Sequence, residues 1–248
     1  MVPAMLQDRH PVDEADIPEL NPALDGAKLA AEFARRGHVQ IPQFLKRETA
    51  QRMHTCLVEE TAYSLIFNDG EKQLEYRDLT PQQRQEFTRA VWRRVGLHAF
   101  QFLYEQHILT LDGQTYADPG HYWARVTDFL NGSPFLDLVR QITGMPDIAF
   151  ADAQASVYRA GHFLTSHGDE SATAKRQAAY VLSLTPSWRP EWGGLLEFIG
   201  KDGHIESGYV PNFNSLRLFR VPINHYVSCV APYAMTSRYS ITGWLRAR

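Results

Sequence analysis

Three things are scarce in this sequence: cysteine, long apolar runs and an excess of either charge. Cys56 and Cys229 are the only cysteines, so a framework of several disulfides is excluded, and we expect both to be buried thiols in a reducing compartment. No apolar run is long enough to cross a bilayer, and residues 1–16 lack the basic start and apolar stretch of a signal peptide. We therefore expect a soluble cytoplasmic protein with no membrane partner.

The formal net charge is −3, from 25 basic and 28 acidic residues, so the chain has no excess of positive charge. Nucleic acid is therefore not expected as a partner, because it is bound mainly through clustered Lys and Arg. The hydrophobic fraction of 44% is ordinary for a globular protein and can fill a core. A chain of 248 residues fits one large domain. Nothing in the sequence indicates its oligomeric state.

Helices dominate the predicted structure of the amino-terminal part. Caps and the helical spacing of apolar residues predict helices over residues 25–36, 48–63, 81 to as far as 107, and 123–143, the last interrupted near 131–132. A short strand is expected over 38–44. The aromatic residues expected in the third helix, Trp92, Phe100, Phe102 and Tyr104, are predicted to pack in the core. Residues 67–80 are predicted to be irregular. Residues 111–122 carry two turn signals and are predicted to be a loop, most often a plain connector and alternatively a lid over the site.

From residue 148 the pattern changes to short strands separated by turn residues. Eight strands are predicted, over residues 148–159, 164–167, 178–184, 195–199, 206–210, 215–220, 226–231 and 239–246. This pattern predicts an α+β fold, with a double-stranded β-helix (jelly roll) core buttressed by the preceding helices. We expect residues 25–248 to form a single domain, helical to about residue 147, after a flexible lead-in over 1–24 that is rich in Pro and acidic residues.

Two histidines and an aspartate in the carboxy-terminal part form a candidate metal site. His167 and Asp169 have the spacing that puts side chains on one face of a strand, so both can reach one ion. His225 would join them from a second strand. Two imidazoles and one carboxylate are the ligand set that holds non-haem Fe(II) and leaves positions open for substrate and O₂. Fe(II) is therefore favoured over Zn²⁺, while Mn²⁺ and Co²⁺ fit the same ligands.

An arginine and a serine near the end of the chain form a second candidate group. Arg238 and Ser240 lie two residues apart on a predicted strand and therefore point to the same face. A guanidinium grips a carboxylate through two parallel hydrogen bonds, and a neighbouring hydroxyl adds another. The pair therefore suits the distal carboxylate of a dicarboxylate co-substrate held at the metal. The alternative interpretation of Arg238 is an exposed cation on an edge strand.

These motifs, in this order, resemble the catalytic core of the Fe(II)/2-oxoglutarate-dependent dioxygenases, and especially their prolyl-4-hydroxylase-like branch. The similar parts are Tyr158, the triad His167, Asp169 and His225, the strand 176–184, the turn 188–194 with its Gly-Gly pair, and Arg238-Tyr239-Ser240. The resemblance is strong over the last third of the chain and weak over the middle. It implies that the protein uses Fe(II), 2-oxoglutarate and O₂, with ascorbate as the reductant.

The resemblance also implies roles for single residues. Arg238 and Ser240 would bind the distal carboxylate of 2-oxoglutarate. Tyr158 would reach the co-substrate or the metal-bound water, unless it is a core residue. Many relatives carry a second anchoring tyrosine where this chain has Ser183, so a different anchor is expected here. Asp169 implies hydroxylation, because halogenating relatives have a small residue at this position.

The implied reaction is hydroxylation of an unactivated C–H bond, coupled to conversion of 2-oxoglutarate to succinate and CO₂. The expected substrate is a protein or peptide side chain such as that of proline. Two alternatives stay open: hydroxylation of a free amino acid or other small metabolite, and a non-catalytic, cupin-like metal-binding protein. The pair Arg238 and Ser240 argues against the last, since a protein that only binds metal has no use for a carboxylate clamp.

Overall fold

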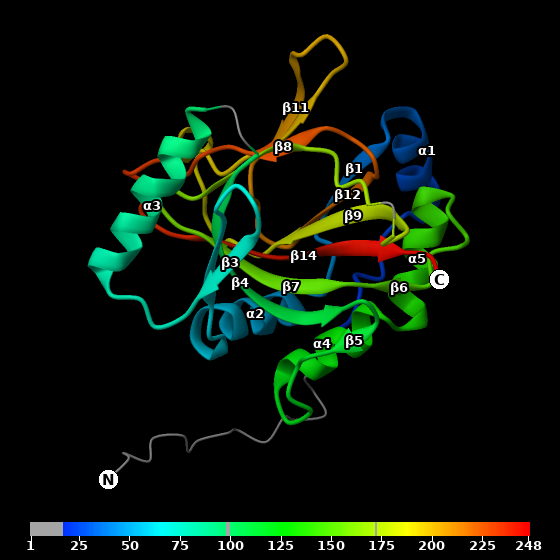
Figure 1. Ribbon diagram of the computed structural model, residues 1–248. Helices are drawn as coiled ribbons and strands as arrows, with labels where there is room; N and C mark the ends of the chain where they lie inside the picture. Colours follow the sequence, from blue (N-terminus) through cyan, green and yellow to red (C-terminus); the bar gives the residue numbers. More distant parts are fainter. Residues whose placement is uncertain (1–16, 98–99, 172) are drawn as a thin grey trace.

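The computed structural model describes residues 17–97, 100–171 and 173–248, in which one curled sheet packs against helices (Figure 1). The α-helices of these residues are α1 Gly26–Arg36, α2 Arg47–Thr55, α3 Pro81–Val95, α4 Tyr122–Leu130 and α5 Ser133–Thr143. A π-helix, Cys56–Glu60, extends α2, and a 3₁₀-helix spans Pro190–Trp192. All five α-helices precede residue 148, as predicted.

Fourteen strands lie in the described residues. The first five are β1 His38–Pro42, β2 Ser64–Asn68, β3 Gln73–Tyr76, β4 Phe102–Leu111 and β5 Gln114–Thr115. The other nine are β6 Phe150–Ala151, β7 Ala153–Tyr158, β8 Phe163–His167, β9 Arg176–Ser183, β10 Leu196–Ile199, β11 Ile205–Tyr209, β12 Ser215–Arg220, β13 His225–Val227 and β14 Arg238–Arg246. The main order is β1-β12-β9-β14-β7-β4-β8-β13-β10-β11. Strand β4 pairs antiparallel with both β7 and β8, so it joins the layer that begins at β1 to the layer that ends at β11. The predicted jelly roll with helical support is confirmed.

Local signals place the helix ends. The Asp25 side chain accepts a hydrogen bond from the backbone N–H of Lys28 at 3.0 Å, and Gly37, with φ of 75°, ends α1. Helix α3 starts with a capping box, in which the Thr80 and Gln83 side chains each bond the other's backbone. These caps satisfy backbone groups that a helix end leaves free, which is why the sequence predicted the starts correctly.

The prediction that the third helix continues toward residue 107 was wrong. Helix α3 ends at Val95, and the aromatic segment beyond it is the ten-residue strand β4. Its apolar and aromatic residues fit both the helical period of about 3.6 residues and the strand period of about two. Pairing with β2 and β7 makes the segment a strand. The segment 67–80, predicted to be irregular, contains most of the hairpin β2–β3. The amino-terminal part is therefore not only helical.

Helices α1, α2 and α5 pack against the outer face of the strand layer that begins at β1. Phe33 of α1, Met53 of α2 and Val139 of α5 are fully buried in one cluster with Leu182 of β9 and Ile241 of β14. Because side chains alternate along a strand, the other residues of β9 and β14 point into the jelly roll. The strands that line the interior are thus fixed from behind by the core.

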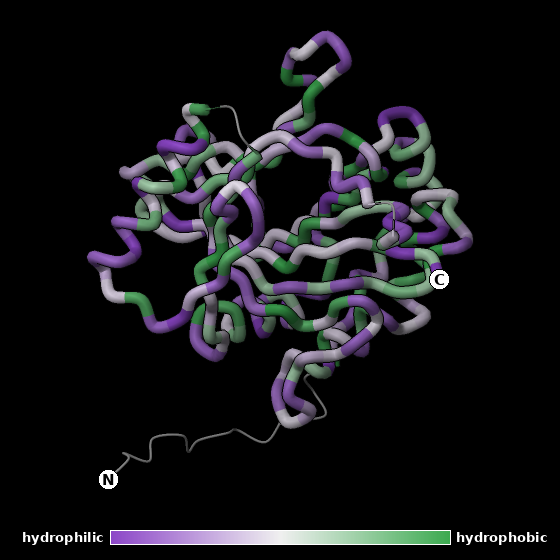
Figure 2. The backbone as a smooth tube through the Cα atoms, viewed as in Figure 1, coloured by the Kyte–Doolittle hydropathy of each residue, from purple (hydrophilic) through white to green (hydrophobic). Residues whose placement is uncertain are grey.

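Part of the predicted lead-in packs on the body of the protein. Leu20 forms an isolated bridge with Leu45 and packs against the core; residues 1–16 of the predicted lead-in lie outside the described residues. Cys56 is buried as predicted, but Cys229 is exposed, because it follows β13 in a surface loop. No helix of the described residues is long and apolar enough to cross a membrane. The hairpin of β10 and β11 projects from the body, and its turn is hydrophilic (Figures 1 and 2).

A buried histidine between β7 and β8 should make stability depend on pH. His162 is 6% exposed, and burial lowers its pKa from 6.5 to about 4, although Glu105 opposes the shift. Between pH 6.5 and about 4, His162 is protonated in the unfolded chain but neutral in the folded chain. Its contribution to stability is therefore lost as pH falls from about 6.5 to 4. It amounts to about 3 kcal/mol at most.

We expect His162→Gln to make the fall in unfolding free energy over this pH range shallower. Urea unfolding at a series of pH values, followed by circular dichroism, measures the slope. His204→Gln is the control, because His204 is exposed. An unchanged slope in His162→Gln would contradict the assignment.

Candidate active site

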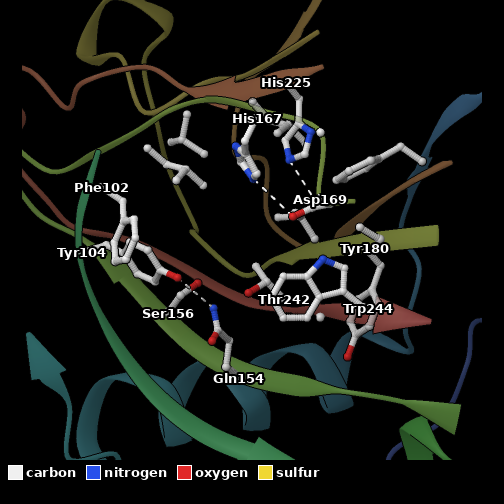
Figure 3. Close-up of a pocket in the computed structure, with 18 of the residues that line it drawn as sticks. Phe102, Tyr104, Gln154, Ser156, His167, Asp169, Tyr180, His225, Thr242 and Trp244 are labelled. Carbon is white, nitrogen blue, oxygen red and sulfur yellow. Dashed lines mark hydrogen bonds and ion pairs between the residues drawn. The ribbon is translucent and has the colours of Figure 1, made fainter. Parts of the chain in front are cut away.

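The three predicted metal ligands lie together inside the jelly roll (Figure 3). His225 begins β13 and pairs directly with His167, the last residue of β8. Directly paired residues of antiparallel strands point to one face, and the two ring centroids are 4.2 Å apart. One ligand atom from each of His167, Asp169 and His225 lies within 4.8 Å of the others. The register of two short strands thus joins distant parts of the chain.

Backbone carbonyls orient both imidazoles. His167 Nδ1 lies 3.0 Å from the carbonyl oxygen of Thr165, and His225 Nδ1 lies 2.9 Å from that of Ile223. A carbonyl only accepts, so each Nδ1 must carry the hydrogen, and Nε2 holds the lone pair of the neutral ring. Metal-binding histidines are commonly held in this way, by a hydrogen bond from the ring nitrogen that does not face the metal.

Asp169 reaches the cluster from a turn and not from a strand, contrary to the prediction. Strand β8 ends at His167, and Asp169 has a positive φ of 63°, which aspartate tolerates better than most residues. The turn brings Asp169 Oδ1 to 3.3 Å from His167 Nε2 and Oδ2 to 3.5 Å from His225 Nε2. Arg176 supports the turn, because its Nη1 donates to the Asp169 carbonyl at 3.1 Å.

The charge states suit metal binding. Burial would raise the pKa of the Asp169 carboxyl, but the neighbouring imidazoles of His167 and His225 hold that pKa below its ordinary value. Burial and the neighbouring His167 lower the pKa of His225, so that its ring is neutral near pH 7. A carboxylate and neutral imidazoles are the forms that ligate metals. Three lone-pair donors that face one another repel unless a cation lies between them, so this donor set fits Fe(II).

A pocket of about 450 Å³ adjoins the triad, within the range of small-molecule sites. Strand β14 runs along it, and its alternate residues point inward from the half-buried Trp244 to Arg238, which is 2% exposed. The register pairs Arg238 with Tyr158 on one side and Ser240 with Ser183 on the other. The predicted clamp therefore lies at the closed end.

Arg238 has the properties of an anion-binding group. Its Nε and Nη1 are buried and have no hydrogen-bond partner in the described residues. Its guanidinium carbon lies 4.9 Å from the ring centroid of Tyr158, and burial lowers the pKa of Arg238. A buried unpaired cation is costly unless a partner is bound. The alternative of an exposed edge cation is wrong.

The other predicted co-substrate residues surround Arg238. Ser240 is fully buried, and its hydroxyl lies 2.9 Å from that of Ser156. Ser183 is also fully buried, and its Oγ has no partner in the described residues. The Tyr158 ring stacks on Tyr104 at 4.9 Å, and burial raises the pKa of Tyr158, so it stays a neutral phenol. The roles of these residues stay predictions.

Several pocket residues were missed by sequence reasoning. Tyr104 was expected to pack in the core, yet it lines the pocket and its hydroxyl accepts from Gln154 Nε2 at 3.3 Å. Phe102 lines the same wall, and the ring of Phe100 lies 5.7 Å from that of His167. The error follows from the wrong helix, because β4 carries these side chains across the pocket. The alternation of Phe102 and Tyr104 is compatible with a strand, but the same residues also suit a helix, so no signal in the sequence predicted this wall.

A second group of possible ligands is Cys56, Glu60 and His121. Burial raises the pKa of the Cys56 thiol far above its ordinary value, so no thiolate forms. The Glu60 carboxylate already accepts two hydrogen bonds from Arg52, at 2.7 and 3.1 Å. Both features oppose metal binding there, and the triad remains the candidate site.

Comparison with known proteins agrees with this geometry. Residues 153–246 match the model of the 2OG-Fe(II) oxygenase superfamily. Over 100 residues the chain is 35% identical to the mouse (Mus musculus) prolyl 3-hydroxylase OGFOD1, a match that covers 38% of this chain and 18% of that protein. The chain thus spans about a fifth of the length of this relative.

Solved structures with the same fold cover nearly the whole chain. A prolyl-4-hydroxylase from Pseudomonas putida superposes with a TM-score of 0.60 and 19% identity, over 90% of this chain and 100% of the other. A prolyl hydroxylase from Trichoplax adhaerens, in complex with a hypoxia inducible factor peptide fragment, gives a TM-score of 0.57 and 15% identity, over 90% and 89%. Residues 153–246 are therefore similar to the 2OG-Fe(II) oxygenase superfamily, and the chain shares its fold with solved prolyl hydroxylases.

Proposed function

We propose that this protein is a non-haem Fe(II)- and 2-oxoglutarate-dependent dioxygenase that hydroxylates a prolyl residue of a protein or peptide. One observation carries the proposal: a convergent His-Asp-His triad and a buried guanidinium with two unpartnered N–H groups share one pocket. A dicarboxylate chelated at the metal needs both groups. The prolyl target is suggested by the names of the relatives.

The residues divide the work between two ends of the pocket. His167, Asp169 and His225 would hold Fe(II), which when bound activates O₂ and, with 2-oxoglutarate, supplies the oxidising power for C–H hydroxylation. At the closed end, Arg238 binds the distal carboxylate, and Ser183 offers a further hydroxyl. Burial strengthens these charged hydrogen bonds, because little water competes for them.

The substrate would lie against an aromatic wall. Phe102, Tyr104 and Trp244 line the pocket together with Gln154 and Thr242. Flat aromatic rings suit a pyrrolidine ring, which they hold by apolar contact. The amide of Gln154 and the hydroxyl of Thr242 offer hydrogen bonds to the backbone of a bound peptide and orient its ring toward the triad.

The test is coupled turnover on defined peptides. Purified protein with Fe(II), ascorbate, O₂ and 2-oxoglutarate should form succinate, and a library of prolyl peptides should contain members that gain one oxygen atom. Mass spectrometry locates the oxygen, and the same peptides with alanine for proline are the control. Succinate without any hydroxylated prolyl peptide would overturn the target, and no succinate at all would overturn the enzyme.

A free amino acid is the second candidate substrate, favoured by two charges at the pocket. Glu170 and Arg176 both line it, and opposite charges suit the ammonium and carboxylate of a free amino acid. Arg176 lies over Trp244, with its guanidinium carbon 3.6 Å from the ring centroid. Free proline and end-blocked prolyl peptides, supplied separately, distinguish the two candidates.

We further propose that residues 25–248 act as one dioxygenase domain and that the protein works in the cytoplasm. One observation supports the domain: helices α1, α2, α4 and α5 share a core cluster with strands β9, β12 and β14. The reducing environment of the cytoplasm suits both free thiols and ferrous iron.

A further inference from the structure

A second buried arginine lies on β12, two strands away from Arg238 on β14. Arg217, in β12, is 2% exposed on a strand whose neighbouring residues Leu216 and Leu218 are fully buried. It points to the same face as Phe219, which lines the pocket. An arginine in such a strand is unusual, because a charged side chain is rarely buried without a partner.

The surroundings of Arg217 do not balance its charge. Its Nη1 donates to the carbonyl of Ser215 at 3.2 Å and its Nη2 to the carbonyl of Val210, while its Nε has no partner. Within the described residues, neither Arg217 nor Arg238 forms an ion pair with a carboxylate. Backbone carbonyls satisfy donors but bring no negative charge.

The register places the two arginines around one serine. Strand β9 lies between β12 and β14, and Ser183 of β9 pairs with Ser215 on one side and Ser240 on the other. Arg217 is two residues from Ser215, and Arg238 is two residues from Ser240. The buried atoms without partners in the two arginines and this serine are Arg217 Nε, Arg238 Nε, Arg238 Nη1 and Ser183 Oγ. All four can donate hydrogen bonds.

We propose that Arg217 is a second cationic group of the co-substrate site, which raises affinity for 2-oxo acids that carry a distal carboxylate. The inference rests on the proposed function and goes beyond it, since Arg238 and Ser240 already complete the predicted clamp. Arg217 acts as a positioning residue, because its charge adds to the field that holds the carboxylate on Arg238. Burial, together with the charge of Arg238, lowers the pKa of Arg217 to about 9, so the two cations destabilise each other until an anion binds.

The test compares two ligands on one set of variants. Calorimetry with Mn²⁺-loaded protein measures the Kd of 2-oxoglutarate and of pyruvate, a 2-oxo acid without the distal carboxylate. We expect Arg217→Met to raise the Kd of 2-oxoglutarate about tenfold and to leave that of pyruvate unchanged. Arg217→Lys, which keeps the charge, should recover most of the affinity. Arg220→Met is the control, because Arg220 lies on the same strand and is exposed.

Each outcome decides between a clamp and a structural role. An equal loss of affinity for both ligands, or an unchanged Kd for 2-oxoglutarate, would overturn the assignment of Arg217. No binding of 2-oxoglutarate by the unmodified protein would overturn the proposed function as well, so the two failures are distinguishable. If Arg217→Met does not fold, Arg217→Gln removes the charge but keeps a donor for the Ser215 carbonyl, and the same comparison applies.

Discussion

Asp169→Ala and His167→Ala are each expected to abolish succinate formation, with a loss of at least about three orders of magnitude. Each change removes one of the three ligand atoms that converge within 4.8 Å. The remaining two ligands cannot hold the ion in a fixed geometry. Succinate release is measured with and without a peptide, and bound iron is measured by elemental analysis.

The control for Asp169→Ala is Glu170→Ala. Glu170 is the next residue in the same turn and carries the same charge, but it is exposed and does not belong to the triad. It should keep its iron and its succinate release in the absence of added substrate. If Asp169→Ala retained near-normal turnover while Glu170→Ala lost it, the carboxylate ligand would have been assigned to the wrong residue.

Arg238→Met is expected to raise the Kd of 2-oxoglutarate by about two to three orders of magnitude, because removing one partner of a buried charge pair costs about 2–5 kcal/mol. The same change should leave the ligand-free protein at least as stable as before. Two buried N–H groups without partners disappear, and a methionine fills similar volume without a charge to bury. Calorimetry and thermal melting measure the two effects separately.

The control for Arg238→Met is Arg246→Met, on the same strand. Arg246 Nη1 bonds both Asp112 and the buried Asp152, the latter at 3.0 Å, so its loss leaves a carboxylate unpaired. We expect this variant to melt earlier and to bind 2-oxoglutarate normally. Destabilisation by Arg238→Met as large as that of Arg246→Met would mean that Arg238 is held by the protein itself and is not waiting for an anion.

Much of the fold could be predicted from the sequence, because its signals are local. Asp25 and Gly37 mark the ends of a helix by their own chemistry, and short strands separated by turn residues indicate a jelly roll. The segment at Tyr104 could not be assigned, because its apolar residues suit both a helix and a strand, and pairing with β2 and β7 is decided by distant residues. Local pattern does not contain that information.

The candidate site, like the fold, could be predicted from the sequence only in part. The spacing of His167 and Asp169 pointed to a metal, but for a partly wrong reason, since a left-handed turn rather than strand alternation brings the carboxylate in. Arg238 could be predicted from its position relative to Ser240. Arg217 could not, because its meaning depends on being buried near a second cation, which only the strand register reveals.

The direct pairing of His167 with His225 has a mechanical consequence. Strand β13 has only three residues, and its pairing with β8 is irregular. An ion held by both histidines would cross-link these two strands. We therefore expect metal binding to slow backbone amide hydrogen exchange at residues 225–227. Removal of the ion by a chelator should then increase the local flexibility of this wall of the pocket, under conditions in which the protein as a whole stays folded.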